Sequence, residues 1–185
     1  MAGARESFFV ITGASGSGKS SLLAEIARRG YACVEEVGRR VVTEQNLLGG
    51  DATPWQNHTK FMELLFARSI QAYAAALELK SPVFFDRALP ECLGYAQSLF
   101  GAARCEALRQ ISRLRYNPCV FVSPPWEEIY TTDAERKHSF EEGVAYHRAE
   151  LAAYAECGYS LLEIPRSSVV ARASFVIRQT LSRVA

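Results

Sequence analysis

The sequence has little charge imbalance, which excludes the partners that a strongly charged chain would favour. Its 185 residues include 21 Lys and Arg against 20 Asp and Glu, a formal net charge of +1, with both signs interspersed. This balance indicates neither a nucleic-acid nor a membrane partner. Long apolar runs are also lacking: none approaches a membrane span, and residues 8–11 are too few for a signal-peptide core. We therefore expect a cytoplasmic protein with one domain over residues 1–185.

Potential metal ligands are few and scattered. Neither a CxxC pair nor an HExxH pair occurs, and the odd number of cysteines lies in largely apolar stretches. We therefore expect reduced, structural thiols and no transition-metal centre. The residues concerned are Cys33, Cys92, Cys105, Cys119 and Cys157, together with His58, His138 and His147.

What the sequence does contain is a strong phosphate-binding motif at residues 13–20, GASGSGKS, which fits GxxxxGK[ST]. Residues 8–11 predict a buried strand before the motif, and residues 20–29 predict a helix after it. Glycines allow successive backbone N–H groups to converge on a phosphate, and the helix N-terminus adds donors and a partial positive charge. The motif in this context predicts a P-loop.

The nucleotide that this loop predicts is ATP with Mg²⁺. No NKxD-type guanine signature is present, but the sequence does not firmly separate ATP from GTP. Lys19 is expected to reach the β- and γ-phosphates, and the Ser20 hydroxyl to ligate Mg²⁺. The predicted nucleotide-binding residues are Gly13, Ala14, Ser15, Gly16, Ser17, Gly18, Lys19, Ser20 and Ser21.

Five apolar segments alternate with helical patterns, which predicts an α/β protein: a three-layer P-loop NTPase with a five-stranded parallel sheet and helices on both faces. The predicted strands cover 8–11, 31–35, 83–86, 119–122 and 159–164. The predicted helices cover 20–29, 36–48, 53–79, 89–100, 102–114, 139–157 and 168–183. Ligands of such folds bind at the carboxyl ends of the strands, so the residues just after each strand carry most information.

Capping chemistry marks three of the helix starts. They are Thr53-Pro54 as N-cap and first helical residue, Ser139 with Glu142 as a capping box, and Ser167 or Ser168 before the last helix.

Two glutamates, Glu35 and Glu36, end the second predicted strand. A carboxylate at this position suits a general base on a substrate hydroxyl, because phosphoryl transfer needs an aligned nucleophile. The alternative is that both pair with Arg39 and Arg40 near the surface. Alternation along the strand does not decide which glutamate points inward.

An Asp-Arg pair, Asp86 and Arg87, ends the third predicted strand. An acidic residue after an apolar strand is the Walker B arrangement, in which the carboxylate holds Mg²⁺ directly or through water. Helix capping is the alternative role for Asp86. The planar guanidinium of Arg87 suits a substrate phosphate or carboxylate, and its alternative is a salt bridge to Glu91.

Residues 133–138 form a charge-rich segment after the fourth predicted strand. We interpret residues 126–140 as a lid, in which Arg136 and Lys137 fold over the phosphates and neutralise charge during transfer. The alternative is a solvated surface loop.

Aromatic residues near the expected cleft offer stacking surfaces. Trp55 and Trp126 lie in predicted loops at the cleft mouth, where an aromatic side chain can stack on a substrate ring. Residues 165–168, after the fifth strand, either line a nucleotide base or form a plain connection.

Taken together, these motifs resemble a family of short bacterial AAA-domain or predicted ATPases of the P-loop class, over about residues 8–181. The motifs are residues 13–20, Glu35-Glu36, residues 85–87, the 124–130 stretch, Asp133-x-x-Arg136 and the Pro165 turn. Within the P-loop class, the layout is similar to nucleoside and nucleotide kinases and to the nicotinamide riboside kinase domain. The resemblance implies a sheet of order 2-3-1-4-5, Asp86 with Arg87 near the acceptor, an acidic base at Glu35 or Glu36, and a lid with Arg136.

The sequence thus favours a kinase-like phosphotransferase that moves the ATP γ-phosphoryl to a small metabolite. The alternatives are a regulatory ATPase read by a protein partner and a nucleotide-binding module without catalysis. We expect an acceptor pocket between the helix over 55–79 and the ends of strands two and three. The predicted catalytic residues are Lys19, Glu35, Glu36, Asp86, Arg87 and Arg136, with Ser20 and Asp86 on the metal. The sequence identifies neither the acceptor nor an oligomeric state.

Overall fold

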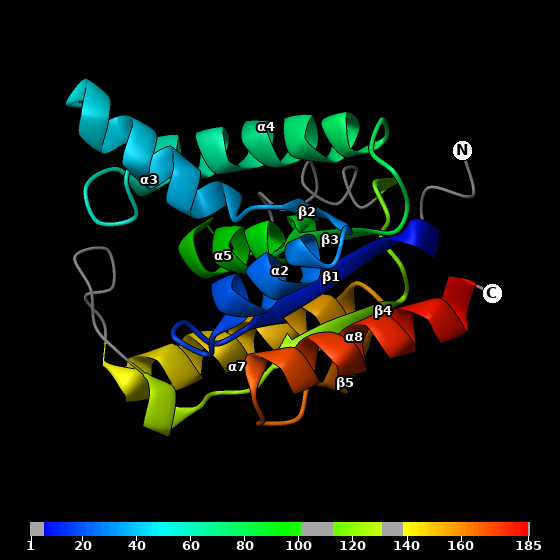
Figure 1. Cartoon of the computed structure of the whole chain (residues 1–185). Coiled ribbons are helices and arrows are strands. Elements are labelled where there is room, and N and C mark those ends of the chain that lie inside the picture. The colour runs from blue at the N-terminus through cyan, green and yellow to red at the C-terminus, as the bar shows by residue number, and fades with distance from the viewer. Residues whose placement is uncertain (1–5, 101–112, 131–138, 185) are drawn as a thin grey trace.

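The computed structural model describes residues 6–100, 113–130 and 139–184, which form a parallel sheet between two layers of helices (Figure 1). Five strands pair in the order β2-β3-β1-β4-β5. They are β1 (Phe8–Gly13), β2 (Ala32–Val34), β3 (Val83–Asp86), β4 (Cys119–Ser123) and β5 (Ser160–Glu163). The helices are α2 (Lys19–Arg28), α3 (Val37–Leu48), α4 (His58–Ala76), α5 (Leu89–Phe100), the short 3₁₀ helix η3 (Glu127–Ile129), α7 (Phe140–Glu156) and α8 (Val169–Val184). The predicted fold class and the sheet order implied by the resemblance are both confirmed.

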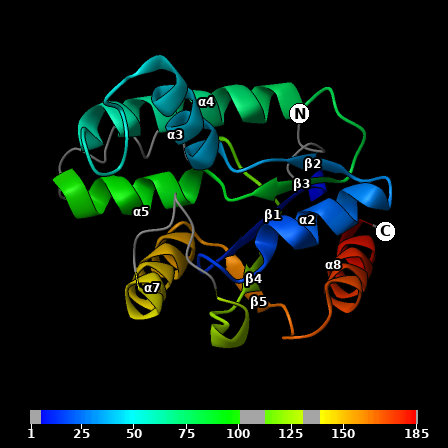
Figure 2. The same ribbon diagram turned by 60° about the vertical axis from the view of Figure 1, so that its left-hand side comes forward.

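Alternation along the central strand β1 builds the two sides of the core. Phe8 and Val10 point to one face, where α4, α5 and α7 pack, and Phe9 and Ile11 point to the other, where α2 and α8 pack (Figure 2). All of β1 is buried, as expected for a strand covered on both faces. The carboxyl ends of the parallel strands therefore open at one edge of the sheet, between the two helical layers.

Two of the predicted helix starts are confirmed. Ser139 and Glu142 form the complete capping box of α7: Glu142 N donates to the Ser139 hydroxyl and Ser139 N donates to the Glu142 carboxylate. At α8 the cap is Ser168, whose hydroxyl accepts from Ala171 N at 3.3 Å.

The predicted start of α4 at Thr53-Pro54 is wrong. The Thr53 carbonyl accepts from Gln56 N and Asn57 N, which closes a turn before the helix. Asn57 is the N-cap, because its side-chain oxygen accepts from Lys60 N at 3.2 Å. Asn is a stronger N-cap than Thr, and it lies next to the first helical residue, His58.

The two edge strands are shorter than predicted. β2 lacks Tyr31 and Glu35, and β5 lacks Tyr159 and Ile164, because each edge strand pairs on one side only and fewer hydrogen bonds hold its ends. Most of the helix predicted over 102–114 lies outside the described residues. No helix within the described part of the chain is both long and apolar enough to cross a membrane.

Candidate active site

The loop between β1 and α2 holds its shape through two glycines that no other residue can replace freely. Gly13 has φ of 139°, and a Cβ on it would lie 2.1 Å from the Ser123 carbonyl oxygen of β4. Gly18 caps α2 in the left-handed region, with φ of 75°. The sequence GASGSGKS thus builds the strand–loop–helix geometry that a P-loop requires.

Lys19 is buried at the base of this loop. Its Nζ donates to the carbonyl oxygens of Gly13 at 2.6 Å and Ala14 at 2.9 Å. Burial lowers its pKa, and the nearby guanidinium of Arg87 lowers it further. The ammonium therefore lies within the loop, on the wall of the cavity that the loop lines.

Not all predicted P-loop residues line this cavity. Ser15, Gly16, Gly18, Lys19, Ser20 and Ser21 do. Gly13, Ala14 and Ser17 do not: they are the buried residues of the loop and support its shape. Ser20, at the start of α2, is exposed to the cavity, where its hydroxyl is available to a metal ligated by phosphates.

Asp86 closes β3 opposite Ile11 of β1. Its carboxylate is 6% exposed, and its Oδ1 has no hydrogen-bond partner. Burial raises its pKa to about 6, while the charge of Lys19 opposes the rise. A buried carboxylate oxygen without a donor, next to a phosphate loop, fits a Mg²⁺ ion that keeps some of its water ligands. Among the described residues no group of three or more acidic, His or Cys side chains is arranged to hold a metal by itself.

Arg87 follows in the left-handed region, with φ of 67°, and its backbone N donates to the Ile11 carbonyl at 3.1 Å. Its guanidinium contacts three carboxylates, which we call the carboxylate cluster: Glu36 at 3.4 Å, Glu91 at 2.5 Å, and Glu150. It also donates to the Gly13 carbonyl at 3.2 Å. Burial lowers the pKa of Arg87, but the three carboxylates outweigh this and raise it well above its usual range.

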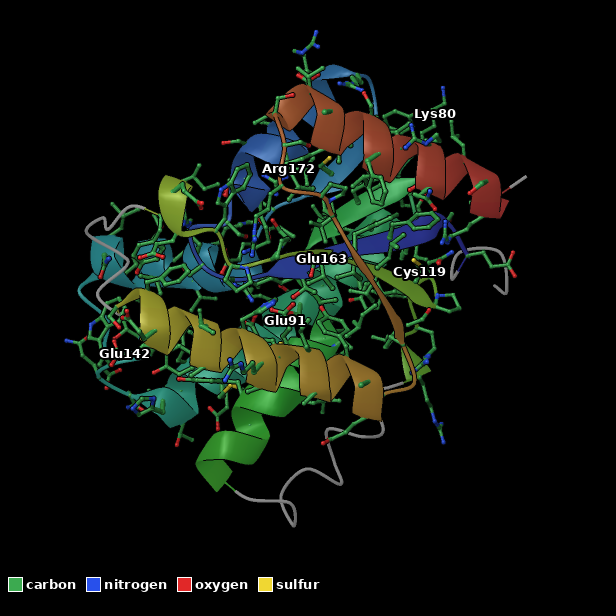
Figure 3. All side chains as sticks on the ribbon, turned by 90° about the horizontal axis from the view of Figure 1, so that it is seen from below. Lys80, Glu91, Cys119, Glu142, Glu163 and Arg172 are labelled. Carbon is green, nitrogen blue, oxygen red and sulfur yellow. The ribbon has the colours of Figure 1, made fainter. Side chains whose placement is uncertain are left out.

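Hydroxyl groups from two elements donate hydrogen bonds to the carboxylate cluster. Glu91 of α5 accepts from Thr12 of β1 at 2.5 Å and from the Tyr154 hydroxyl of α7 at 2.8 Å. Glu91 lies between α7 and the sheet in Figure 3. One site thus joins residues from four parts of the chain. The predicted Arg87–Glu91 salt bridge is present, within a larger cluster that sequence reasoning did not anticipate.

Two residues of α7 that line the same cavity each have a buried polar atom without a hydrogen-bond partner. Burial raises the pKa of Glu150 to about 7, and its Oε2 accepts no hydrogen bond. His147 lies one turn earlier, 6% exposed, with Nδ1 unpartnered and its pKa lowered to about 4 by burial. Their i, i+3 spacing is the signal in the sequence that places both on one face of the helix.

The two glutamates after β2 have different positions. Glu36 contacts Arg87 and belongs to the cluster, whereas Glu35 is exposed at the rim of the cavity. The structure thus separates two residues that strand alternation left equivalent.

Arg172 of α8 is a site residue that sequence reasoning missed. It is 2% exposed, donates to the carbonyl oxygens of Ser17 at 3.0 Å and Gly18 at 3.5 Å, and also donates to the Ser123 hydroxyl. Figure 3 shows it between the start of α8 and the loop before α2. Its guanidinium lies 5.8 Å from the ring centre of Trp126, and burial lowers its pKa. Arg172 therefore ties the P-loop to β4 and α8.

These residues line one cavity of ≈ 1330 Å³. It begins at the P-loop and Trp126, passes Asp86 and the carboxylate cluster, and extends to Trp55 and Phe61 beside α4. Ser167 and Ser168 line the P-loop end. Arg136 and Lys137 lie outside the described residues, so the lid stays a prediction.

The sheet order, the loop before α2 and the carboxylate that closes β3 define a P-loop protein with a kinase-like fold. The chain belongs to the AAA-domain family, whose model matches residues 8–172. No protein of curated function matches the sequence significantly.

Similar solved structures are kinases and a protein named NadR. NadR, solved in complex with NR, superposes with a TM-score of 0.74 at 17% identity, over 96% of this chain and 51% of its own. This chain thus spans about half of NadR. Deoxyadenosine kinase from M. mycoides has a TM-score of 0.60 at 19% identity, over 95% of this chain and 99% of its own. Thymidylate kinase from Candida albicans has a TM-score of 0.60 at 13% identity, over 98% and 94%. These likenesses show a shared fold.

Proposed function

We propose that the protein is an ATP-dependent phosphotransferase that moves the γ-phosphoryl group of ATP to a hydroxyl of a small metabolite. The observation that carries the proposal is the cavity of ≈ 1330 Å³, which continues from the P-loop past Asp86 to the carboxylate cluster. A switch that hydrolyses ATP needs room for one water beside the γ-phosphate, whereas a kinase needs a pocket of metabolite size. The kinase-like fold supports the same reading.

The donor end would bind ATP through the loop amides and Lys19. Lys19 exchanges its contacts with the Gly13 and Ala14 carbonyls for the β- and γ-phosphates, which are stronger, charge-assisted acceptors. Ser20 and the unpartnered Oδ1 of Asp86 would hold Mg²⁺, which when bound neutralises phosphate charge.

The acceptor end would supply the base. Glu36 takes the proton of the acceptor hydroxyl while the hydroxyl oxygen forms a bond to the γ-phosphorus. The bond between the γ-phosphorus and the β–γ bridging oxygen breaks, and ADP leaves. Arg87 lies between the two ends, since it contacts both Glu36 and the Gly13 carbonyl of the P-loop. It orients the base and offsets negative charge there. Arg136 remains a predicted lid contribution.

The test is acceptor-dependent release of ADP across a metabolite library. The wild-type protein should hydrolyse ATP slowly alone and many-fold faster with the right metabolite. Glu36→Gln should abolish the stimulated rate and leave ATP affinity unchanged, since a base acts on the acceptor. Glu35→Gln tests the other glutamate and is expected to retain transfer, and Glu63→Gln, exposed on α4, is the matched control.

The donor end has its own test by calorimetry. Lys19→Ala should weaken ATP·Mg²⁺ binding, because a charge-assisted contact is lost, whereas Asp86→Asn should depress turnover more than affinity. If ATP binds but no metabolite accelerates ADP release, the regulatory ATPase becomes the better assignment. Wild-type affinity in the Lys19 variant would remove the nucleotide assignment altogether.

A further inference from the structure

We propose that the acceptor is a hydroxyl-bearing ring compound without negative charge, neutral or cationic, and that the site rejects phosphates and carboxylates. The proposal rests on the phosphotransferase function above and specifies the substrate class of that site. It follows from the charges around the acceptor end of the cavity, from two unpartnered atoms there, and from the aromatic side chains of the wall.

The cation at the centre of the acceptor end is already engaged. Arg87 contacts Glu36, Glu91 and Glu150 and donates to the Gly13 carbonyl. An anionic acceptor needs guanidinium donors for its own oxygens, as in bidentate recognition of phosphate or carboxylate. The buried Nε of Arg87 has no hydrogen-bond partner, but it lies 3.4 Å from Glu36. To gain a bidentate contact an anionic acceptor would therefore have to displace a carboxylate, and Glu91 is held by Thr12 and Tyr154 as well as by the guanidinium.

Among the residues that the structure describes, the carboxylates around Arg87 outnumber the cations. Three carboxylates share one guanidinium, and the rim adds the exposed side chains of Glu35 and Glu142 against that of Arg39. Lys19 and Arg172 donate to the P-loop carbonyls, although the charge of Lys19 also acts on Glu36 and Glu150. A second anion at the acceptor end would therefore face like charges in a partly buried site, where water screens them poorly.

The unpartnered atoms favour hydroxyl groups. Glu150 Oε2 and His147 Nδ1 are buried, lack hydrogen-bond partners and lie one helical turn apart on the wall of the cavity. A carboxylate oxygen requires a donor, and a phosphate dianion offers only acceptors. A hydroxyl donates and accepts, so it can partner either of these atoms, whereas a phosphate dianion cannot supply the donor that the carboxylate oxygen requires.

Aromatic side chains form part of the remaining wall. Four aromatic side chains line the cavity beside α4, α5 and α7: Trp55, Phe61, Tyr95 and Tyr146. The rings of Phe61 and Tyr95 pack edge to face, with their centres 6.0 Å apart. Aromatic faces bind flat rings, and they attract a ring that carries positive charge. The aromatic side chains and the carboxylate cluster thus both favour a ring that is uncharged or positively charged.

Binding by the full-length chain tests this inference separately from catalysis. The protein is saturated with Mg²⁺ and a non-hydrolysable ATP analogue, and calorimetry then compares three forms of one ring: cytidine, 3-methylcytidine (cationic at neutral pH) and cytidine 5′-monophosphate. Parallel sets built on uridine and guanosine, and shikimate as a hydroxy acid, complete the panel. We expect at least one uncharged or cationic member to bind, and to bind at least tenfold more tightly than its own monophosphate.

A monophosphate or shikimate that binds more tightly than every uncharged and cationic member overturns the inference. A panel in which no member binds, although the ATP analogue does, overturns it too. ADP release that depends on a monophosphate would keep the phosphotransferase function and refute the charge class. Absence of ATP binding would instead refute the function itself.

A charge-removing variant gives the second measurement. Glu150→Gln keeps the side-chain shape but removes one carboxylate, so the preference for 3-methylcytidine over the monophosphate should fall by about tenfold. Glu156→Gln, exposed two turns later on α7, should leave the ratio unchanged. Circular dichroism of both variants confirms folding. An unchanged ratio in folded Glu150→Gln contradicts the proposed role of the cluster.

Discussion

Arg87 occupies a backbone conformation that side chains disfavour. Its φ of 67° costs about 1 kcal/mol relative to the right-handed region, and three carboxylates hold its guanidinium there. The carboxylates need the guanidinium in turn, because a partly buried cluster of like charges is unstable without it. A single residue therefore both bends the chain after β3 and neutralises the centre of the site.

Arg87→Gly separates these two contributions. Glycine relieves the backbone, yet the unopposed carboxylates should lower the free energy of unfolding by about 2–4 kcal/mol at pH 7.5. At pH 5 the loss should shrink, since protonated carboxyl groups repel each other less. Urea denaturation at the two pH values measures this, and an equal loss at both would contradict the electrostatic origin.

Arg172 shows why the sequence predicts only part of a site. Arginine on an amphipathic helix normally faces solvent, so the residue type of Arg172 predicts a surface position. It is nevertheless spaced four residues before Val176 and eight before Thr180, both buried, so it lies on the buried stripe of α8. The position of Arg172 along the helix indicates burial, whereas its residue type indicates exposure. The P-loop residues were predictable because their spacing is local and specific.

Arg172→Lys should loosen the P-loop, since an ammonium cannot reach Ser17, Gly18 and Ser123 in the geometry of a guanidinium. We expect ATP affinity to fall by about tenfold, a loss of about 1.4 kcal/mol, with the fold retained. Calorimetry measures the affinity. Arg178→Lys, exposed on the same helix, is the matched control and should bind as the wild type does.

At the scale of elements, local chemistry predicted most helices and strands but not how close they pack. The capping box at Ser139 and the strand at β3 are short-range patterns, so they were read from sequence. The carboxylate cluster instead joins Glu36, Glu91 and Glu150, which are distant in the chain. They meet because α5 lies against α7 and because β2, which leads to Glu36, pairs with β3. Thr53 and Asn57 show the limit of cap prediction: both are capping residues, and tertiary context selects one.

Gly94 sets the approach of α5 and α7. A Cβ on Gly94 would lie 2.9 Å from the Ala153 Cβ, and neither atom is at the end of a flexible chain. Gly94→Ala should therefore lower the free energy of unfolding by about 1 kcal/mol despite the better helix propensity of alanine. The comparison is Gly38→Ala in α3, where the nearest atom is 3.7 Å away, and which should gain up to about 1 kcal/mol. Equal effects in the two variants would show that the contact is not limiting.

For the whole molecule, the buried site groups make stability depend on pH. Burial raises the pKa of Glu150 to about 7 and that of Asp86 to about 6, so the folded state holds protons that the unfolded chain releases near pH 4. Stability from these groups is therefore greatest at low pH and falls as pH rises through 4 to 7. His147 opposes this trend, because its pKa is lowered to about 4 and the unfolded chain takes up a proton near pH 6.5.

Comparing the wild type with Glu150→Gln isolates the contribution of Glu150 to the pH dependence of stability. Between pH 5 and 7 the wild type should lose about 1–2 kcal/mol of unfolding free energy relative to the variant, whose amide does not titrate. Denaturation curves of the ligand-free protein at half-unit steps give the difference. Two profiles that stay parallel across this range would mean that the Glu150 carboxyl titrates normally.

The start of β1 and the end of α8 lie at the same edge of the sheet, opposite the P-loop (Figure 1). Glu6 lies there because its carbonyl accepts from the Asn117 side chain just before β4, and α8 runs back across the sheet to Val184. Attachment through either end therefore leaves the mouth of the cavity facing free solution. The protein can be tethered to a sensor surface or fused to a reporter by either end, and both orientations should give the same ligand affinities.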